Sequence, residues 1–180
     1  YQVEVVFRNS GNTVKADVSV TGLYSTDSFN RKYYYDGQLG AIYSAEKTDF
    51  KVWSPISTRI TLRVYENGTP VSVSSAKGSD QHADYEMVKS EKGVFEYTLS
   101  GDQQGKYYTY VVYNVRYPEG KEVVDPYARS AGVNGLRGMV VDFSRTDPDG
   151  WDSIGYLKYD RKELTVWETH VADVTSSDTW

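Results

Sequence analysis

The chain has 180 residues, enough for one substantial hydrophobic core, and we expect one complete domain with flanking segments. Its formal net charge is −5 at pH 7, and no stretch concentrates Lys and Arg as binding to a phosphate backbone requires, so nucleic acid is not an expected partner. No apolar run approaches the roughly 20 residues that span a bilayer, so we expect no membrane partner, and the absence of cysteine excludes disulfides and cysteine nucleophiles.

The first predicted element is a β-hairpin. Apolar and polar residues alternate with period two in two runs, 1–8 and 14–20, on either side of the turn-forming residues 9–12. Further alternating runs predict strands, in chain order, within 48–55 (TDFKVWSP), 59–68 (RITLRVYENG), 93–101 (GVFEYTLSG), 106–117 (KYYTYVVYNVRY), 121–126 (KEVVDP) and 138–143 (GMVVDF). Helical periodicity is nearly missing, so the sequence predicts a chain built from short strands.

These strands indicate an all-β fold. Six or seven short strands over roughly 100 residues, separated by turns, are typical of an immunoglobulin-like antiparallel β-sandwich. Beyond this region, residues 146–163 have no sustained period and read as a linker, and the apolar, β-branched run 164–174 predicts a final buried strand. The predicted core, taken from the inward faces of the strands, comprises Phe50, Val52, Ile60, Leu62, Phe95, Leu99 and Tyr110.

The chain offers few candidates for metal or cofactor chemistry but many tyrosines. His82 and His170 lie far apart, and neither belongs to a motif such as HExxH, so we predict no metal and no cofactor. There are 17 tyrosines and 4 tryptophans against 5 phenylalanines. Such rings fill cores, which is their usual role, and they also stack on ligands with apolar faces and hydroxylated edges, such as sugars.

Four strings carry a more specific signal. They are YYYDGQLGAIYSAEKTDFKVWSP at 33–55, EVVDPYARSAGVNGLRGMVVDF at 122–143, TDPDGWDS at 146–153 and VWETHVADVTS at 166–176. In this order the chain resembles type I pullulanases of glycoside hydrolase family 13. The first two strings are similar to those that bracket a carbohydrate-binding module of family 48, the third resembles the crossing to the catalytic barrel, and the fourth resembles the first barrel strand. Thr169 and Ala172 depart from that family's pattern at the barrel's first turn.

The resemblance implies a domain organisation and a function. The implied segments are a remnant of a preceding segment (1–32), a sandwich module (33–145), a linker (146–163) and the first strand of a truncated (β/α)₈ barrel (164–180). The module would be a non-catalytic part of an extracellular or cell-surface enzyme that hydrolyses α-1,6 linkages in starch or pullulan. It would bind α-glucan weakly or position the remainder of its own barrel; the alternative is a purely structural spacer with no carbohydrate binding.

The same resemblance places both catalytic carboxylates beyond Trp180, so no catalytic residue is predicted and we expect no hydrolysis from this chain. The best glucan-stacking candidates are Tyr113 and Tyr117, on the longest predicted strand and close to a turn, and Tyr65 is the third candidate. The alternative interpretation is that these three tyrosines are ordinary surface aromatics without a ligand. Glycogen-binding members of the module family use a pair of tryptophans that has no counterpart around 66–69 and 118–121.

Four other residues are interpreted as structural. Asp125 stands before a proline, where an extended or turn conformation lets the carboxylate accept nearby backbone N–H groups. Trp53 lies on the outward face of its strand, and we expect it to dock against the barrel rather than to bind sugar. Trp151 is expected to pin the linker, and Trp167 to pack in the barrel strand.

Overall fold

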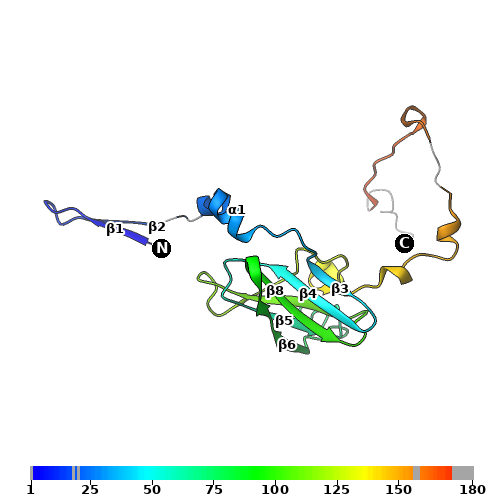
Figure 1. Ribbon diagram of the computed structural model, residues 1–180. Helices are drawn as coiled ribbons and strands as arrows, with labels where there is room; N and C mark the ends of the chain where they lie inside the picture. Colours follow the sequence, from blue (N-terminus) through cyan, green and yellow to red (C-terminus); the bar gives the residue numbers. More distant parts are fainter. Residues whose placement is uncertain (1, 18, 20, 156–158, 172–180) are drawn as a thin grey trace. The chain divides into compact units, whose positions relative to one another are not determined.

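A computed structural model describes residues 2–17, 19, 21–155 and 159–171 (Figure 1). The chain divides into two compact units, the first ending at Phe143 and the second beginning at Ser144. Strands dominate the first unit, whereas the described part of the second contains short 3₁₀ turns. No helix among the described residues is long and apolar enough to cross a bilayer.

The first unit contains eleven named strands and one α-helix among its described residues. The strands are β1 (Gln2–Val6), β2 (Thr13–Asp17), β3 (Gly40–Tyr43), β4 (Lys47–Trp53), β5 (Arg59–Tyr65), β6 (His82–Glu86), β7 (Val88–Lys89), β8 (Val94–Ser100), β9 (Tyr107–Tyr113), β10 (Lys121–Val123) and β11 (Gly138–Met139). The helices are α1 (Asp27–Tyr33) and the 3₁₀ turns η1 (Thr21–Ser25), η2 (Glu91–Gly93), η3 (Val133–Gly135), η4 (Phe143–Arg145), η5 (Trp151–Ser153) and η6 (Arg161–Glu163).

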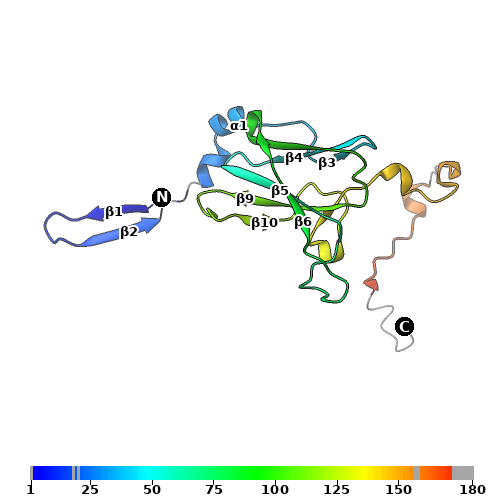
Figure 2. The same ribbon diagram turned by 90° about the horizontal axis from the view of Figure 1, so that it is seen from below.

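Two antiparallel sheets form the body of this unit, and they lie as stacked layers in Figures 1 and 2. One has the order β10-β9-β5-β6, and the other has the order β3-β4-β8-β7. The two short strands β10 and β11 both pair with β9, β10 along Tyr110–Val112 and β11 along Tyr107–Tyr108. The predicted antiparallel β-sandwich is confirmed.

The core lies between the two sheets, where alternate residues of β4, β5, β8 and β9 point inward. Phe50 of β4 and Tyr108 of β9 are both buried, and their ring centroids are 5.0 Å apart in an edge-to-face arrangement. Six residues of the predicted core are buried, namely Phe50, Val52, Ile60, Leu62, Phe95 and Tyr110. The seventh, Leu99, is partly buried and packs against the same cluster.

Helix α1 was not predicted, although its N-terminus has a recognisable cap. The side chain of Thr26 accepts a hydrogen bond from the backbone N–H of Phe29, Asp27 lies in the first turn, and Arg31 and Lys32 lie in the last. Seven residues give less than two full amphipathic turns, so periodicity alone could not reveal the helix.

The predicted N-terminal hairpin is present as β1 and β2, which pair from Gln2↔Asp17 to Val6↔Thr13. Three strands were not predicted: β3, β6 and β7. The sequence of β6, HADYE, is mostly polar, because this strand lies at the edge of its sheet. Strand β7 has two residues, which are too few to show an alternation.

The predicted barrel strand is not seen among the described residues. The stretch 164–170 has no strand assignment, and Val166 and Trp167 are 86% and 78% exposed. A barrel strand needs hydrogen-bonding neighbours on both edges, and no strand among the described residues pairs with this one. Residues 172–180 lie outside the described part of the chain, so the barrel strand stays a prediction. Trp151, expected to pin the linker, is 55% exposed.

Candidate functional site

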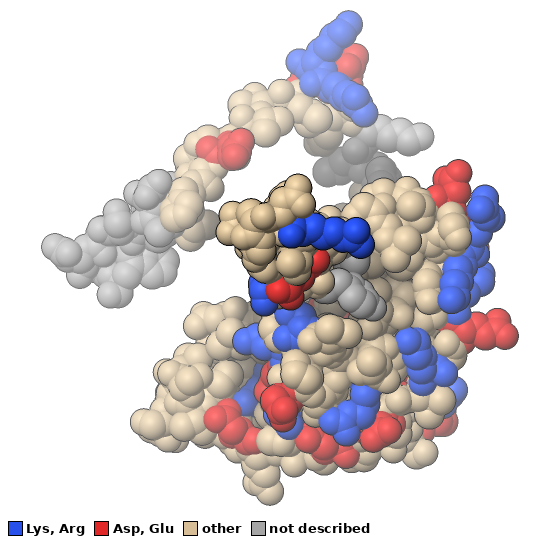
Figure 3. Space-filling model, turned by 90° about the vertical axis from the view of Figure 1, so that its left-hand side faces the viewer, with Lys and Arg blue, Asp and Glu red and all other residues tan. Residues whose placement is uncertain are grey.

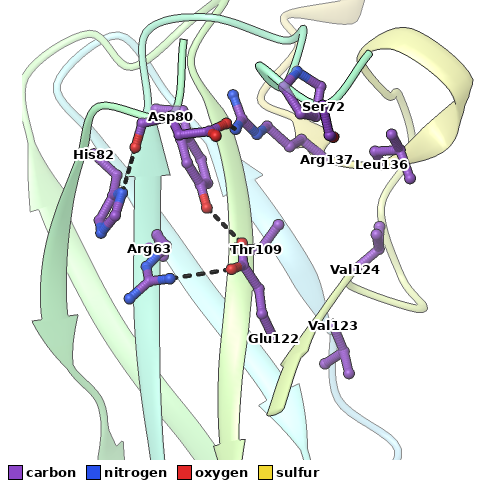
Figure 4. A pocket seen from close by; sticks show the side chains of 12 residues that line it. Arg63, Ser72, Asp80, His82, Thr109, Glu122, Val123, Val124, Leu136 and Arg137 are labelled. Atoms are coloured by element: carbon purple, nitrogen blue, oxygen red, sulfur yellow. Dashed lines mark hydrogen bonds and ion pairs between the residues drawn. The ribbon is translucent and has the colours of Figure 1, made fainter. Parts of the chain in front are cut away.

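A groove of about 540 Å³ opens on the outer face of the β10-β9-β5-β6 sheet (Figure 4). The sheet forms its floor, the loop between β5 and β6 forms one wall, and the segment after β10 forms the other. We call this feature the polar groove. It is lined by Arg63, Tyr65, Pro70, Ser72, Asp80, His82, Thr109, Glu122, Val123, Val124, Leu136 and Arg137.

Glu122 is the centre of the groove floor. Its carboxylate accepts hydrogen bonds from the hydroxyl of Tyr65, from Oγ1 of Thr109 at 2.7 Å and from Nη1 of Arg63 at 3.0 Å. Partial burial by itself raises the pKa of Glu122, but the bonds from Tyr65 and Thr109 and the charge of Arg63 outweigh that effect, and the pKa is lowered. Glu122 is therefore held as a carboxylate whose lone pairs already have donors.

Arg63 links Glu122 to the neighbouring edge strand. Strands β5 and β6 pair so that Arg63 lies directly opposite Asp84. The guanidinium donates from Nε and Nη2 to the two carboxylate oxygens of Asp84, at 2.8 and 2.9 Å. This bidentate bond lowers the pKa of Asp84. His82 lies two residues before Asp84 on β6, with Nε2 at 3.7 Å from the same carboxylate.

Arg137 fixes the wall of the groove. Its Nη1 donates to the carbonyl oxygens of Asn67 and Ser79, at 2.6 and 2.8 Å, and its Nη2 donates to Asp80 at 2.7 Å. The guanidinium lies over the ring of Tyr65, 3.6 Å from the centroid. Arg137 is 3% exposed, so one buried cation ties the β5–β6 loop to the segment that precedes β11.

The groove presents planar hydrogen-bonding groups whose charges are paired with one another. Such groups can form further hydrogen bonds at their exposed edges with a neutral polyhydroxylated ligand. No group of three or more His, Asp or Glu side chains in the described part of the chain could hold a metal ion. Over the face shown in Figure 3, basic and acidic side chains are interspersed rather than gathered into a patch of one sign.

A family model described as carbohydrate-binding module 48 (isoamylase N-terminal domain) matches residues 38–128, which covers every strand from β3 to β10. This match spans half of the chain. The chain belongs to the carbohydrate-binding module 48 family. The two stacked sheets described above are thus the fold of a module 48 sandwich.

The relatives found by sequence are larger proteins. The chain is 32% identical to the pullulanase of Bacillus subtilis over 172 residues, which is 96% of the chain and 21% of that protein. It is 29% identical to the pullulanase of Klebsiella aerogenes over 76% of the chain and 13% of that protein. The module 48 chain therefore spans about a fifth or less of the length of these two relatives.

Solved pullulanase structures agree with this similarity. The pullulanase of Paenibacillus barengoltzii in complex with maltohexaose and α-cyclodextrin superposes with a TM-score of 0.62 at 30% identity, covering 72% of this chain and 18% of that one. The pullulanase of Anoxybacillus sp. LM18-11 gives a TM-score of 0.59 at 35% identity, covering 78% and 18%. The resemblance to type I pullulanases predicted from the sequence is confirmed.

Of the three tyrosines predicted from the sequence, Tyr65 and Tyr113 belong to neighbouring strands of one sheet of this module 48 domain, and Tyr117 lies beyond the end of β9. Tyr65 is 3% exposed beneath Arg137, so it lines the groove without offering a free ring face. Tyr113 is half-buried at the far end of β9, with the guanidinium of Arg59 3.8 Å from its ring centroid. Tyr117 is 38% exposed in the following turn. Sugar binding by any of the three stays a prediction.

Two residues interpreted as structural have clear roles in the module 48 fold. Asp125 is 3% exposed and accepts the backbone N–H of Tyr127 at 2.9 Å, as expected, and also the hydroxyl of Tyr108 at 2.8 Å. Burial raises the pKa of Asp125. Trp53 donates its indole N–H to the carbonyl oxygens of Tyr33 and Lys92, at 2.8 and 3.1 Å, so it packs beside the end of α1; docking on a barrel stays a prediction.

Sequence reasoning missed Glu122 and Arg137, which hold the groove together. Arg137 follows a stretch rich in glycine, and its partners Asn67 and Ser79 lie 70 and 58 residues earlier. No periodicity could connect positions so distant. The register of β9 with β10, in which Glu122 faces Val111, also had no signature in the sequence.

Proposed function

We propose that this chain is a non-catalytic accessory module of a pullulanase-type enzyme, one that hydrolyses α-1,6 linkages in starch, pullulan or related α-glucans, and that the module binds α-glucan weakly. The supporting observation is the polar groove, an open site lined by planar hydrogen-bonding side chains on the face of a carbohydrate-binding module 48 sandwich. Tyr113 lies at the other end of the same face, about 13 Å along β9 from Thr109, and Tyr117 lies in the turn that follows this strand.

Weak binding follows from the state of the aromatic side chains. Tyr65 is covered by Arg137, and the guanidinium of Arg59 lies 3.8 Å from the ring centroid of Tyr113. The guanidinium of Arg116 also lies over the ring of Tyr117, at 5.6 Å, so none of the three candidates offers a ring that is free of a cation. A single ring contact contributes about 1 kcal/mol, and binding also costs conformational entropy of the side chains and of the sugar. We therefore expect a dissociation constant in the millimolar range, equivalent to about −4 kcal/mol.

A second candidate function is positioning of the catalytic barrel without sugar binding. The observation that favours it is that Arg63, Glu122, Asp80 and Arg137 are already bonded to one another or to nearby backbone groups. A ligand would find few unpaired donors on the groove floor. An extracellular location for the parent enzyme remains a prediction that rests on the resemblance.

Titration of the chain with maltoheptaose, followed by backbone amide NMR shifts, separates the two functions. Binding at the polar groove predicts shifts at Thr109 and Glu122. A glucan chain that also reaches the turn after β9 predicts a shift at Tyr117 and a weaker affinity in the variant Tyr117→Ala. The matched control is Tyr159→Ala, an exposed tyrosine of the second unit, which should bind like the parent chain. Cellohexaose, a β-linked glucan, controls for nonspecific contact.

Absence of shifts at saturating maltoheptaose would leave the positioning function and overturn the binding proposal. Micromolar affinity would also contradict it, because it would require an aromatic platform that the groove lacks.

A further inference from the structure

A second hollow, of about 250 Å³, lies beside helix α1 and is lined mainly by aromatic rings. We call it the aromatic crevice. The rings are those of Phe29, Tyr33, Tyr34, Tyr35, Trp53 and Tyr127, and the remaining lining residues are Asn30 and Leu39. Tyr34 and Tyr127 are 65% and 40% exposed, so rings remain accessible at its surface.

Three contacts assemble this crevice from distant parts of the chain. The indole N–H of Trp53 bonds to the carbonyl of Tyr33, which fixes the end of α1 against β4. Gly40 has φ +92°, and a Cβ there would lie 2.8 Å from the carbonyl oxygen of Tyr127, so glycine permits the close approach of these two segments. The carboxylate of Asp125 accepts a hydrogen bond from the backbone N–H of Tyr127. The rings are thus set by the fold rather than by a free loop.

The lining is uncharged, although Lys, Arg, Asp and Glu make up 25% of the chain. A neutral ligand can bury its surface there without stripping water from an ion. Four of the six rings are tyrosines, which pair an apolar face with a hydroxyl, and Asn30 adds an amide that can donate and accept. Apolar faces edged by hydrogen-bonding groups are complementary to a sugar ring.

We infer that the aromatic crevice is a second α-glucan site, separate from the polar groove, that takes one or two glucose units of a chain. The volume sets this limit, because it lies below the roughly 300 Å³ at which pockets enclose a drug-sized ligand. The inference rests on the proposed binding of α-glucan. Its neutral, hydroxyl-edged rings favour a sugar over a segment of protein as occupant.

The indole resonance of Trp53 provides a direct test on the whole chain. On titration with maltoheptaose, this resonance and the backbone amides of Tyr34 and Tyr127 should shift together along one binding curve. Tyr34→Ala should raise the dissociation constant of that curve about two- to tenfold, the scale of one aromatic contact, whereas Tyr34→Phe should keep most of the affinity. Tyr159→Ala, which removes an exposed tyrosine outside the crevice lining, should leave the curve unchanged.

The outcomes separate this inference from the proposed function. Shifts confined to the polar groove, with Trp53 unmoved, would overturn the second site and leave weak glucan binding intact. The second site would also be overturned if the crevice residues shifted but neither Tyr34→Ala nor Tyr127→Ala raised the dissociation constant. This outcome counts only if both variants keep the dispersed spectrum of the parent. No shift anywhere at saturating sugar would overturn both proposals.

Discussion

Replacement of Arg137 by methionine should destabilise the sandwich more than any surface change of similar size. The variant keeps an unbranched side chain of similar length but loses the donors to the carbonyls of Asn67 and Ser79 and the cation above Tyr65. Each carbonyl bond to a charged donor contributes about 1 kcal/mol or more, and the cation–π contact also contributes about 1 kcal/mol or more. The bond to Asp80 adds little, because that carboxylate is 59% exposed.

Together these terms predict a loss of about 3 kcal/mol in the free energy of unfolding. For a unit of this size that corresponds to a fall in Tm of about 12 °C. Urea unfolding monitored by circular dichroism gives the free energy, and amide hydrogen exchange across 67–80 should quicken in the same variant. The free energy of unfolding of Arg137→Lys should lie between those of the parent and of Arg137→Met, because a single ammonium group cannot reproduce the hydrogen bonds of the planar guanidinium.

The matched control is Arg129→Met, which removes an exposed arginine eight residues earlier and should change stability by less than about 0.5 kcal/mol. If Arg137→Met were as stable as Arg129→Met, with hydrogen exchange in the loop unchanged, the bonds of Arg137 would not be what holds the β5–β6 loop.

Asp125→Asn should change the pH dependence of stability: because burial raises the pKa of Asp125 above its ordinary 3.8, stability is greatest with the carboxyl protonated and is lost as pH rises through the raised pKa. Glu122 and Asp84, whose pKa values are lowered, add the opposite pH dependence to parent and variant alike. The stability of the parent relative to the variant, from urea unfolding, should therefore fall from acid to neutral pH, and parallel profiles would contradict this. Gly40→Ala should cost about 1–3 kcal/mol, because its Cβ would meet Tyr127 at a positive φ, whereas Gly155→Ala, in open space, should be near neutral; equal Tm values would refute the close approach. The purified chain should release no reducing ends from pullulan, and contaminant-free turnover would refute the proposed non-catalytic role.

The sandwich could be predicted from the sequence because its central strands bury one face each. Strands β4, β5 and β8 alternate apolar and polar residues, and this alternation identified the inward side chains. Leu99 is less buried than expected because it lies near the end of β8. The edge strand β6 escaped prediction, because it has solvent on much of its surface and so carries little apolar signal.

The candidate site was less predictable, because it depends on contacts between distant segments. Tyr65 was expected to be accessible from its place on the outward face of β5, and on an isolated sheet it would be. The loop that follows β5 and the buried Arg137 cover it instead. The aromatic crevice similarly requires Tyr127 to meet the segment around Tyr34, and neither position carries a local signal for that contact.

The pairing of β9 with three other strands has a consequence for how copies of this protein behave toward one another. The sequence of β9, YYTYVVY, has high β-propensity and no charge or proline, which are the features of segments that join into cross-β assemblies. In the folded chain β5 occupies one edge of β9, while β10 and β11 divide the other between them. Two strands of three and two residues thus cover one edge of an uncharged strand with high β-propensity, and loosening residues 121–139 would leave that edge open to pairing with another copy.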